Sequence, residues 1–556
     1  MLASPPSIHL RVPRLQLMNR LGVPTLRQLF RSVLLGFAAL LWTTGSISAQ
    51  PAPLAGLDAY VEQALHDWEI PGLALAVVQG DSLLHARGYG VTRLDGDEEV
   101  DEHTLFAIAS TTKAMTVAAL GILVDEGQLS WDDPVSRHLP GFQVSDPYVT
   151  QQLKVRDLLT HRAGVARMDN LWIASPFHRA EILDRARHLP QVQSFREEYG
   201  YNNILYIAAG EIVESITGTS WDAFLESRIF QPLEMHRSTT RAAVVEEREN
   251  VAHSHTRVDG QIQAIPRRDY DAIGGAGAAW SSASELARWV KLHLGQGEFE
   301  AESLVSAQRL EEMYTPHTPI PIDSVGARLH PTNHFLSYAL GWRVQDLHGT
   351  RLVHHSGSIN YTRTQITMVP DEGIGIVAMA NLSSSNLQLA LTHWILDALQ
   401  DREQQDWSSL YLELLHRNQE QGDQAEEELV ASRLPDTGPS LTPEAYVGRY
   451  EDDLFGTVTI ELQGDAESWR EDAGESEGAE GQLSEAHESS PGFVGLVLHY
   501  SDEYVADLVH WHQDLFRAEW RRPGAGRTFA HFTLDPQGRL TEVKLDGFAT
   551  FSRVDP

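Results

Sequence analysis

The stretch IASTTKAMTVAALGILVDEG, residues 108–127, constrains the fold of this chain more than any other part of its sequence. From Ala114 to Val124 it is apolar except for Thr116, which predicts a helix over Thr111–Glu126 that Gly127 ends. A helix that is apolar on nearly every side has to be buried. The chain has 556 residues, enough for two or more domains and a large core around this helix.

This helix also carries Lys113, one of only four lysines in the chain. A buried ammonium costs several kcal/mol unless it is paired, so such an amine tends to lose its proton, which an arginine cannot do. Ser110 stands three residues earlier on the same face, at roughly 5–6 Å between Cβ atoms. The segment therefore offers a nucleophile, a base and, at the positive end of a helix, part of an oxyanion site. The alternative is a capping serine with a lysine that reaches solvent.

The stretch EYGYNN, residues 198–203, contains Tyr201 and Asn203 just before a predicted helix over Ile204–Ile216. Tyr201 should therefore lie on a loop. A phenol beside a lysine and an active serine could transfer protons, provided that its pKa of about 10 falls beside a cation. The alternative is a core aromatic side chain at the start of a helix.

The stretch HHSGSIN, residues 354–360, follows a predicted strand over Arg351–Val353. Gly357 would let a substrate backbone lie close, and the N–H of Ser358 could be a second oxyanion donor. The alternative is a strand end with a turn.

In this order, the three pieces resemble the serine β-lactamase and penicillin-binding-protein superfamily, and in particular its class C β-lactamase-like branch. The resemblance covers residues 53–400. Further stretches carry it: IPGLALAVV (70–78), LSWDDPVSRHLPGF (129–142), VRDLLTHRAGV (155–165), YNNILYIAAGEIVESITG (201–218), GGAGAAWSSASELARW (274–289) and MVPDEGIGIVAMAN (368–381).

The resemblance implies a role for each site residue. Ser110 is the acylated nucleophile, and Lys113 and Tyr201 share the general-base and general-acid work. Asn203 orients Lys113 and the substrate amide. The N–H groups of Ser110 and Ser358 form the oxyanion hole.

His355, Ser356 and Gly357 stand where this branch often has Lys-Thr-Gly, and they are expected to line the substrate site. His-x-Gly is the usual variant in the peptidase-like and esterase-like members. A lysine is a fixed cation suited to a β-lactam carboxylate, whereas histidine is mostly neutral at pH 7. The variant therefore favours peptidase or esterase action over β-lactam hydrolysis.

The expected fold class is α/β (α+β), with an antiparallel sheet flanked by helices. The strands predicted for that sheet enclose a long helical region, and a helix over Asn386–Leu399 closes it. These strands are Leu73–Val78, Leu83–Gly88, Tyr338–Val344, Arg351–His354, Thr364–Val369 and Gly373–Ala380.

Beyond residues 53–400, a polar linker with a helix is expected over 401–440 and a small all-β domain over 441–556. TPEAYVGRYE (442–451) and GRLTEVKLDGFATFSRV (538–554) resemble the lipocalin-like β-barrel that follows such catalytic domains. Predicted strands here are Gly448–Tyr450, Thr457–Leu462, Gly492–Tyr500, Phe529–Leu534 and Leu540–Leu545. Residues 464–490 contain nine acids and one arginine, which predicts a disordered acidic insertion.

The first 49 residues predict a secretory signal peptide. They hold five arginines and no acid, and a ten-residue apolar run over Val33–Trp42 is too short to span a bilayer. An N-terminal core helix is the alternative, and Met18 is a candidate for the true start. The prediction is a periplasmic or secreted protein with no membrane span after signal removal.

Composition narrows the function classes further. The chain has no cysteine, which excludes disulfides, a thiol nucleophile and cysteine-bound metals. Its net charge of −34 disfavours nucleic acid as a partner; a high-salt habitat and a GC-rich genome explain the acidic, arginine-rich composition equally well. The pairs His253/His255 and His510/His512 lack an obvious third ligand, so neither a metal nor a cofactor is expected.

The sequence thus predicts a secreted serine hydrolase that works through an acyl-enzyme on an amide or ester. A D-amino-acid peptide or small ester is favoured over a β-lactam. The alternative is a β-lactam- or peptide-binding sensor or scaffold with little turnover. The expected partner is a small molecule or short peptide, and the oligomeric state is left open.

Overall fold

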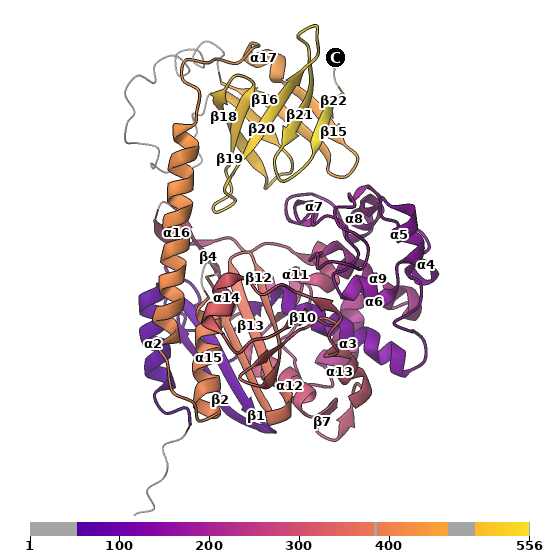
Figure 1. Ribbon diagram of the computed structural model, residues 1–556, viewed down its shortest axis with the longest axis vertical. Helices are drawn as coiled ribbons and strands as arrows, with labels where there is room; N and C mark the ends of the chain where they lie inside the picture. The colour runs from indigo at the N-terminus through magenta and orange to yellow at the C-terminus, as the bar shows by residue number, and fades with distance from the viewer. Residues whose placement is uncertain (1–52, 259, 383–385, 465–494, 555–556) are drawn as a thin grey trace, which may run out of the picture. The chain divides into compact units, whose positions relative to one another are not determined.

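An eight-stranded antiparallel sheet organises the larger part of the protein (Figure 1). The computed structural model describes residues 53–258, 260–382, 386–464 and 495–554. The strands lie in the order β2 (Ser82–Gly90), β1 (Gly72–Gln79), β14 (Ile374–Ala380), β13 (Thr362–Val369), β12 (Thr350–Ile359), β11 (Arg343–Leu347), β10 (Leu336–Tyr338) and β9 (Thr318–Pro319).

Helices cover both faces of this sheet, as alternating side chains of β2 show. Arg87 forms an ion pair of 2.9 Å with Asp58 of α2 (Leu57–Trp68). The neighbouring Ala86 points the other way and lines a cavity with α12 (Ala283–Leu294). Because successive side chains of a strand point to opposite faces, α2 and α12 lie on opposite sides of the sheet. α15 (Leu387–Leu399) packs against α2.

The apolar helix is buried as the sequence predicted. α3 spans Thr112–Asp125, and every residue from Thr112 to Leu123 is buried. It contacts α9 (Ile204–Thr217) and the turn over Asp271–Ala276. The other helices between β2 and β10 are α4 (Val135–His138), α5 (Pro147–Gln152), α6 (Val155–Leu159), α7 (Asn170–Ile173), α8 (Arg179–Arg185), α10 (Trp221–Leu225), α11 (Ala242–Glu246), α13 (Ala307–Met313) and α14 (Ser324–Leu329).

Two strand predictions were wrong in their bounds. The predicted strand over Tyr338–Val344 is a tight hairpin, in which Tyr338 of β10 pairs with Arg343 of β11. Gly341 reverses the chain there at a φ of 76°, a conformation that glycine adopts without steric cost. The stretch HHSGSIN does not follow a strand: β12 continues to Ile359, because its pairing with β13 extends to Thr362.

The C-terminal region forms a closed eight-stranded barrel in which each strand pairs with the next. Its strands are β15 (Gly448–Asp452), β16 (Gly456–Gln463), β17 (Gly495–His499), β18 (Val505–His512), β19 (Leu515–Trp520), β20 (Arg527–Leu534), β21 (Leu540–Leu545) and β22 (Thr550–Arg553). The predicted fold class is therefore confirmed, although the sequence missed β18, β19 and β22. The likeness to lipocalins stays a prediction, as do the domain boundaries.

Between sheet and barrel, the polar linker contains one long helix, α16, over Trp407–Ala431, and α17 (Pro443–Tyr446) precedes β15. The predicted signal peptide over residues 1–49 lies outside the described residues, as does all but the first residue of the predicted acidic insertion. No helix in the described part of the chain has the length and hydrophobicity needed to cross a bilayer.

Candidate active site

Ser110 lies in a short turn that is wedged against β12. A 3-10 turn over Ala109–Thr111 leads into α3, and Ala109 adopts a left-handed φ of 48°, which costs about 1–2 kcal/mol for a residue with a Cβ. On the facing strand, a Cβ at Gly357 would lie 2.2 Å from the carbonyl oxygen of Ile108 and 2.9 Å from the amide nitrogen of Ser110. Only glycine lets β12 approach the nucleophile turn this closely.

The Lys113 amine is completely buried and points at the Ser110 hydroxyl. Its Nζ lies 3.2 Å from Ser110 Oγ, and it donates to Asn203 Oδ1 and to the carbonyl oxygen of Ala276, both at 2.7 Å. Because these two oxygens can only accept, a neutral amine would spend both N–H groups on them and turn its lone pair toward Ser110. The structure thus places the buried amine of Lys113 beside the Ser110 hydroxyl.

Burial sets the charge state of this amine. Loss of solvation lowers the pKa of Lys113 well below 10.5. The carboxylate of Asp169 opposes this shift, and the guanidinium groups of Arg167 and Arg343 add to it. Lys113 is thus suited to serve as a base at a lower pH than an exposed lysine.

Tyr201 completes a chain of three polar groups. It lies on the loop before α9, as predicted, and its Oη donates a hydrogen bond of 2.8 Å to Ser110 Oγ. The expected fall in its pKa was wrong: burial raises the pKa of Tyr201 above 10, and the hydrogen bond to Ser110 offsets this only in part. The phenol is therefore protonated, and Tyr201 begins as a proton donor.

Asn203 is held by two partners. Its Oδ1 accepts from Lys113, and its Nδ2 donates to Asp169 Oδ1 at 2.9 Å. His161 is buried, and its Nδ1 accepts from the amide nitrogen of Asn202 at 3.1 Å. The ring centroids of His161 and Tyr201 lie 4.2 Å apart, so His161 supports the loop that carries Tyr201 and Asn203.

The predicted oxyanion donors face one open strand edge. β11 pairs with β12 only as far as His354, so residues 355–359 have β13 on one side and no strand on the other. Gly357 abuts Ser110 at this edge, and the next residue, Ser358, is exposed. A carbonyl group entering beside Ser110 would meet the backbone of both serines.

The structure does not turn His355 toward the nucleophile. The side chain is buried; its Nδ1 lies 2.7 Å from the carbonyl oxygen of Ser356, and its Nε2 lies 2.9 Å from Tyr338 Oη. The carbonyl can only accept, so Nδ1 carries a proton. Burial, with Arg343 and Lys113, lowers the pKa of His355 well below 6.5. His355 thus supports β12 from within, and the substrate contacts expected of His355, Ser356 and Gly357 stay predictions.

Three further residues of the site were missed by the sequence prediction. Asp169 and Arg167 adjust the charge of Lys113, and Arg343 is a largely buried cation whose Nε has no hydrogen-bond partner among the described residues. No spacing rule in the sequence ties these residues to Ser110. Only the folded chain brings them together.

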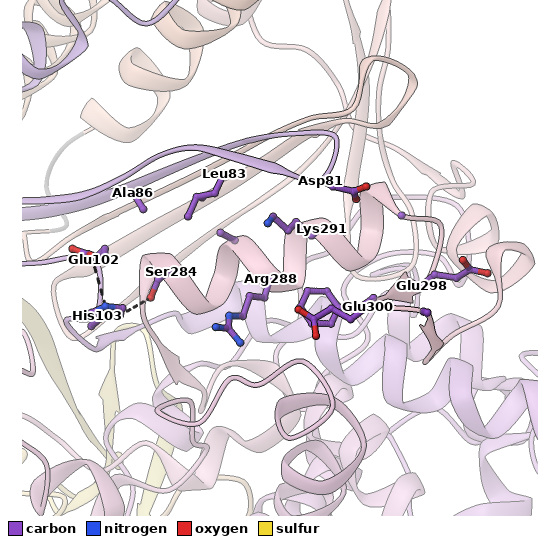
Figure 2. A pocket seen from close by; sticks show the side chains of 14 residues that line it. Asp81, Leu83, Ala86, Glu102, His103, Ser284, Arg288, Lys291, Glu298 and Glu300 are labelled. Atoms are coloured by element: carbon purple, nitrogen blue, oxygen red, sulfur yellow. Dashed lines mark hydrogen bonds and ion pairs between the residues drawn. The ribbon is translucent and has the colours of Figure 1, made fainter.

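A cavity also lies away from Ser110. It holds about 810 Å³ between β2 and α12, and none of the candidate site residues lines it (Figure 2). In this cavity, Ser284 Oγ lies 3.0 Å from His103 Nδ1. The His103 side chain is more than half exposed, and neither a buried base nor an oxyanion donor accompanies this pair among the described residues. We therefore place the candidate site at Ser110.

The two histidine pairs are built into the structure in other ways. His255 Nε2 accepts from the amide nitrogen of Leu94 at 3.1 Å, and His510 Nε2 lies 3.0 Å from the carbonyl oxygen of Gln513. Within the described ranges, no group of three or more His, Asp or Glu side chains is arranged to hold a metal ion.

Known proteins are similar to large parts of this chain. The chain is 29% identical over 446 residues, 74% of its length and 77% of the other's, to "Unguisins hydrolase ungD" of Aspergillus violaceofuscus. It is 25% identical over 350 residues to "Protein flp" of Staphylococcus aureus, covering 61% of this chain and 65% of that one.

Among solved structures, the octameric penicillin-binding protein homologue from Pyrococcus abyssi superposes with a TM-score of 0.57 at 19% identity, over 90% of this chain and all of that one, which supports the fold. A domain of unknown function, DUF3471, matches residues 432–555. The Beta-lactamase family model matches residues 57–400, and by this match the chain belongs to the Beta-lactamase family.

Proposed function

We propose that this protein is a serine hydrolase that forms an acyl-enzyme at Ser110. The hydrogen-bonded chain from Tyr201 through Ser110 to the buried Lys113 carries this proposal. Relatives with the same fold include proteins named as hydrolases, which supports a hydrolase here.

The geometry supports the following sequence of proton transfers. Neutral Lys113 takes the hydroxyl proton of Ser110 as Oγ attacks the substrate carbonyl. The N–H groups of Ser110 and Ser358 stabilise the tetrahedral oxyanion. Tyr201 gives its proton to the leaving nitrogen or oxygen, and the Lys113 ammonium restores that proton. A water molecule then attacks the acyl-enzyme ester at Ser110, and the same groups transfer the protons in the reverse direction. This step releases the carboxylic acid product and regenerates Ser110.

The charges around the site support a substrate with a carboxylate on its leaving group. His355 is neutral and buried, so it supplies no cation for a β-lactam carboxylate. Arg343 is charged at all accessible pH values, and it lies near Tyr201, the proposed proton donor. A short peptide whose leaving group is a D-amino acid fits this pattern and the family resemblance, with a small ester as the second substrate class. Export to the periplasm or medium belongs to this proposal.

Active-site labelling tests the nucleophile. A fluorophosphonate probe is expected to label the wild-type chain and to fail on Ser110→Ala. Ser284→Ala is the matched control, because Ser284 lies beside a histidine in the cavity between β2 and α12 and should keep full labelling. Labelling that survives Ser110→Ala and disappears in Ser284→Ala would overturn the proposal.

Turnover separates the hydrolase from a sensor. The panel is p-nitrophenyl acetate, N-acetyl-D-alanyl-D-alanine, whose leaving group is D-alanine, and nitrocefin, each tested with wild type and Ser110→Ala. A hydrolase should turn over the first two many times, with nitrocefin the poorest substrate. One equivalent of product followed by a persistent acyl adduct would instead identify the sensor.

A further inference from the structure

A second, smaller cavity adjoins the candidate nucleophile. It holds about 490 Å³ and is lined by Ser358, Ile359, Asn360 and Tyr361, which follow Gly357 at the end of β12 and in the turn to β13. Because Gly357 packs against Ser110, a group attached to an acylated serine has this space beside it. The remaining lining comes from α7, from residues 268 and 270, and from barrel loops.

Specific contacts hold the barrel loops at this cavity. Asn170 of α7 donates to the carbonyl oxygen of Gly547 at 2.8 Å, and Tyr361 Oη donates to that of Pro523 at 3.2 Å. A Cβ at Gly524 would lie 2.4 Å from Tyr361 Oη, so the loop approaches as closely as glycine permits. Tyr361 itself has a left-handed φ of 62°, a strained conformation that this contact helps to hold. The barrel thus forms a fixed wall of the cavity.

The cavity walls are rich in aromatic rings. On the barrel side, the ring centroids of Tyr504 and Trp520 are 5.6 Å apart, and those of Trp520 and Phe548 are 5.7 Å apart. Trp172 and Tyr361 line it from the catalytic domain. A flat apolar group would find rings on both sides, and such stacking contributes beyond the burial of area alone.

The cavity also has an unbalanced positive charge. Arg268 and the barrel residue Arg522 both contact the same oxygen of Glu503, each at 2.8 Å, so two cations share one carboxylate. Arg522 also donates to Asn360 Oδ1 at 3.0 Å. The acid among the lining residues, Asp546, already pairs with Lys544 at 3.2 Å. In a chain with a net charge of −34, this cluster is suited to an anionic group.

The site geometry indicates which half of the substrate enters this space. The leaving group must lie within reach of Tyr201, which packs with His161 and Tyr338 at the His355 end of the open edge of β12. The cavity begins at Ser358, on the other side of Gly357. It therefore receives the acyl half.

We propose that the barrel and the catalytic domain together form an acyl pocket for an aromatic group that carries a carboxylate, with Trp520 as the stacking residue and Arg522 as the anion-binding residue. The inference deepens the proposed function and rests on acylation of Ser110.

Three esters with one leaving group test this pocket in the full chain: the p-nitrophenyl esters of acetic acid, phenylacetic acid and (4-carboxyphenyl)acetic acid. In the wild type, kcat/KM should rise in that order. Trp520→Leu should reduce the ratio of phenylacetate to acetate about tenfold, and Arg522→Gln should reduce the ratio of carboxyphenylacetate to phenylacetate about tenfold. Arg539→Gln, an exposed barrel arginine paired with Asp535, is the control and should change neither ratio. Unchanged ratios in both pocket variants would overturn the pocket.

A binding measurement keeps the pocket testable apart from hydrolysis. Calorimetry with (4-carboxyphenyl)acetic acid and Ser110→Ala should detect binding that each pocket substitution, added to that background, weakens about tenfold. If Ser110 fails to label but this pattern holds, the proposed function is wrong and the pocket stands. If Ser110 labels and the acid does not bind, the pocket is wrong and the hydrolase stands.

Discussion

Lys113 shows how a single buried charge can be adjusted by residues far away in the sequence. Its amine has no solvent exposure, and the charged groups that shift its pKa are Asp169, Arg167 and Arg343. The carboxylate favours the ammonium form, whereas the two guanidinium groups favour the neutral amine. The balance decides at which pH the base becomes available.

Two substitutions should move the acid limb of kcat/KM in opposite directions. Asp169→Asn removes the charge that raises the pKa of Lys113, so the limb should shift to lower pH. Arg167→Gln removes a charge that lowers it, so the limb should shift to higher pH, by less at high salt because Arg167 is exposed. The pH dependence of p-nitrophenyl acetate hydrolysis measures both. Shifts of the same sign would show that Lys113 is not the titrating base.

At the scale of elements, the approach of β12 to the nucleophile turn depends on one missing side chain. Gly357→Ala would place a methyl group 2.2 Å from the carbonyl oxygen of Ile108, so the strand and the turn must separate. A displacement of about 1 Å in a catalytic geometry can cost roughly 10²-fold in rate. The rate of fluorophosphonate labelling should fall by about that factor. Gly141→Ala, where nothing lies within 4 Å, should label like the wild type.

A second prediction concerns the docking of α16, where His330 Nε2 lies 3.2 Å from Tyr411 Oη and the His330 ring stacks on Trp407. Burial lowers the pKa of His330 from 6.5 to about 4. Between pH 4 and pH 6.5, His330 binds a proton in the unfolded chain but not in the folded chain. Its contribution to the free energy of unfolding is therefore fully present above pH 6.5 and is lost as the pH falls toward 4. The loss is about 1.4 kcal/mol per pH unit.

Hydrogen exchange of the α16 amides, corrected for intrinsic rates, should therefore show protection that decreases from pH 7 to pH 5. His330→Gln, which keeps a hydrogen-bonding side chain for Tyr411, should reduce this pH dependence. An equal dependence in the variant would assign the effect to other groups, such as the adjacent His393.

At the scale of the whole molecule, the barrel is attached through backbone contacts that leave no room for side chains. Gly524 has a φ of 73° and faces Tyr361 at 2.4 Å, whereas Gly526 has a φ of 76° and nothing within 4 Å. Alanine would strain the backbone at either position, because both glycines have a positive φ. Only alanine at position 524 would also clash with Tyr361.

Gly524→Ala should loosen the barrel and Gly526→Ala should not. The expected readouts are faster limited proteolysis in the segment 432–447 and loss of the acyl preference among the three esters, while Ser110 still labels. Both variants suffer the penalty of an alanine at positive φ, so their difference measures the contact. Equal behaviour of the two variants would contradict a docked barrel.

Much of the candidate site was predictable because its determinants are local. Ser110 and Lys113 lie one helical turn apart, and the apolar character of α3 alone requires that the amine be buried. Tyr201 and Asn203 were placed by a short pattern ahead of a recognisable helix. Strands such as β1 and β14 were predicted because fully buried strands appear as short apolar runs.

Other features depended on pairing across long distances in the sequence. The extent of β12 follows from its register with β13, the orientation of His355 follows from Tyr338, and the protonated state of Tyr201 follows from burial around Lys113. Barrel strands β18 and β19 mix polar and apolar residues, because their inner and outer faces become defined only when the barrel closes.

The sequence by itself determined that a serine and a buried amine share one helix face, because helical spacing and hydrophobicity are properties of a local segment. Only the tertiary structure decided which charges surround that amine, where β12 meets Ser110 and which barrel residues border the neighbouring cavity. These depend on segments hundreds of residues apart, whose contacts arise from the packing of the whole chain.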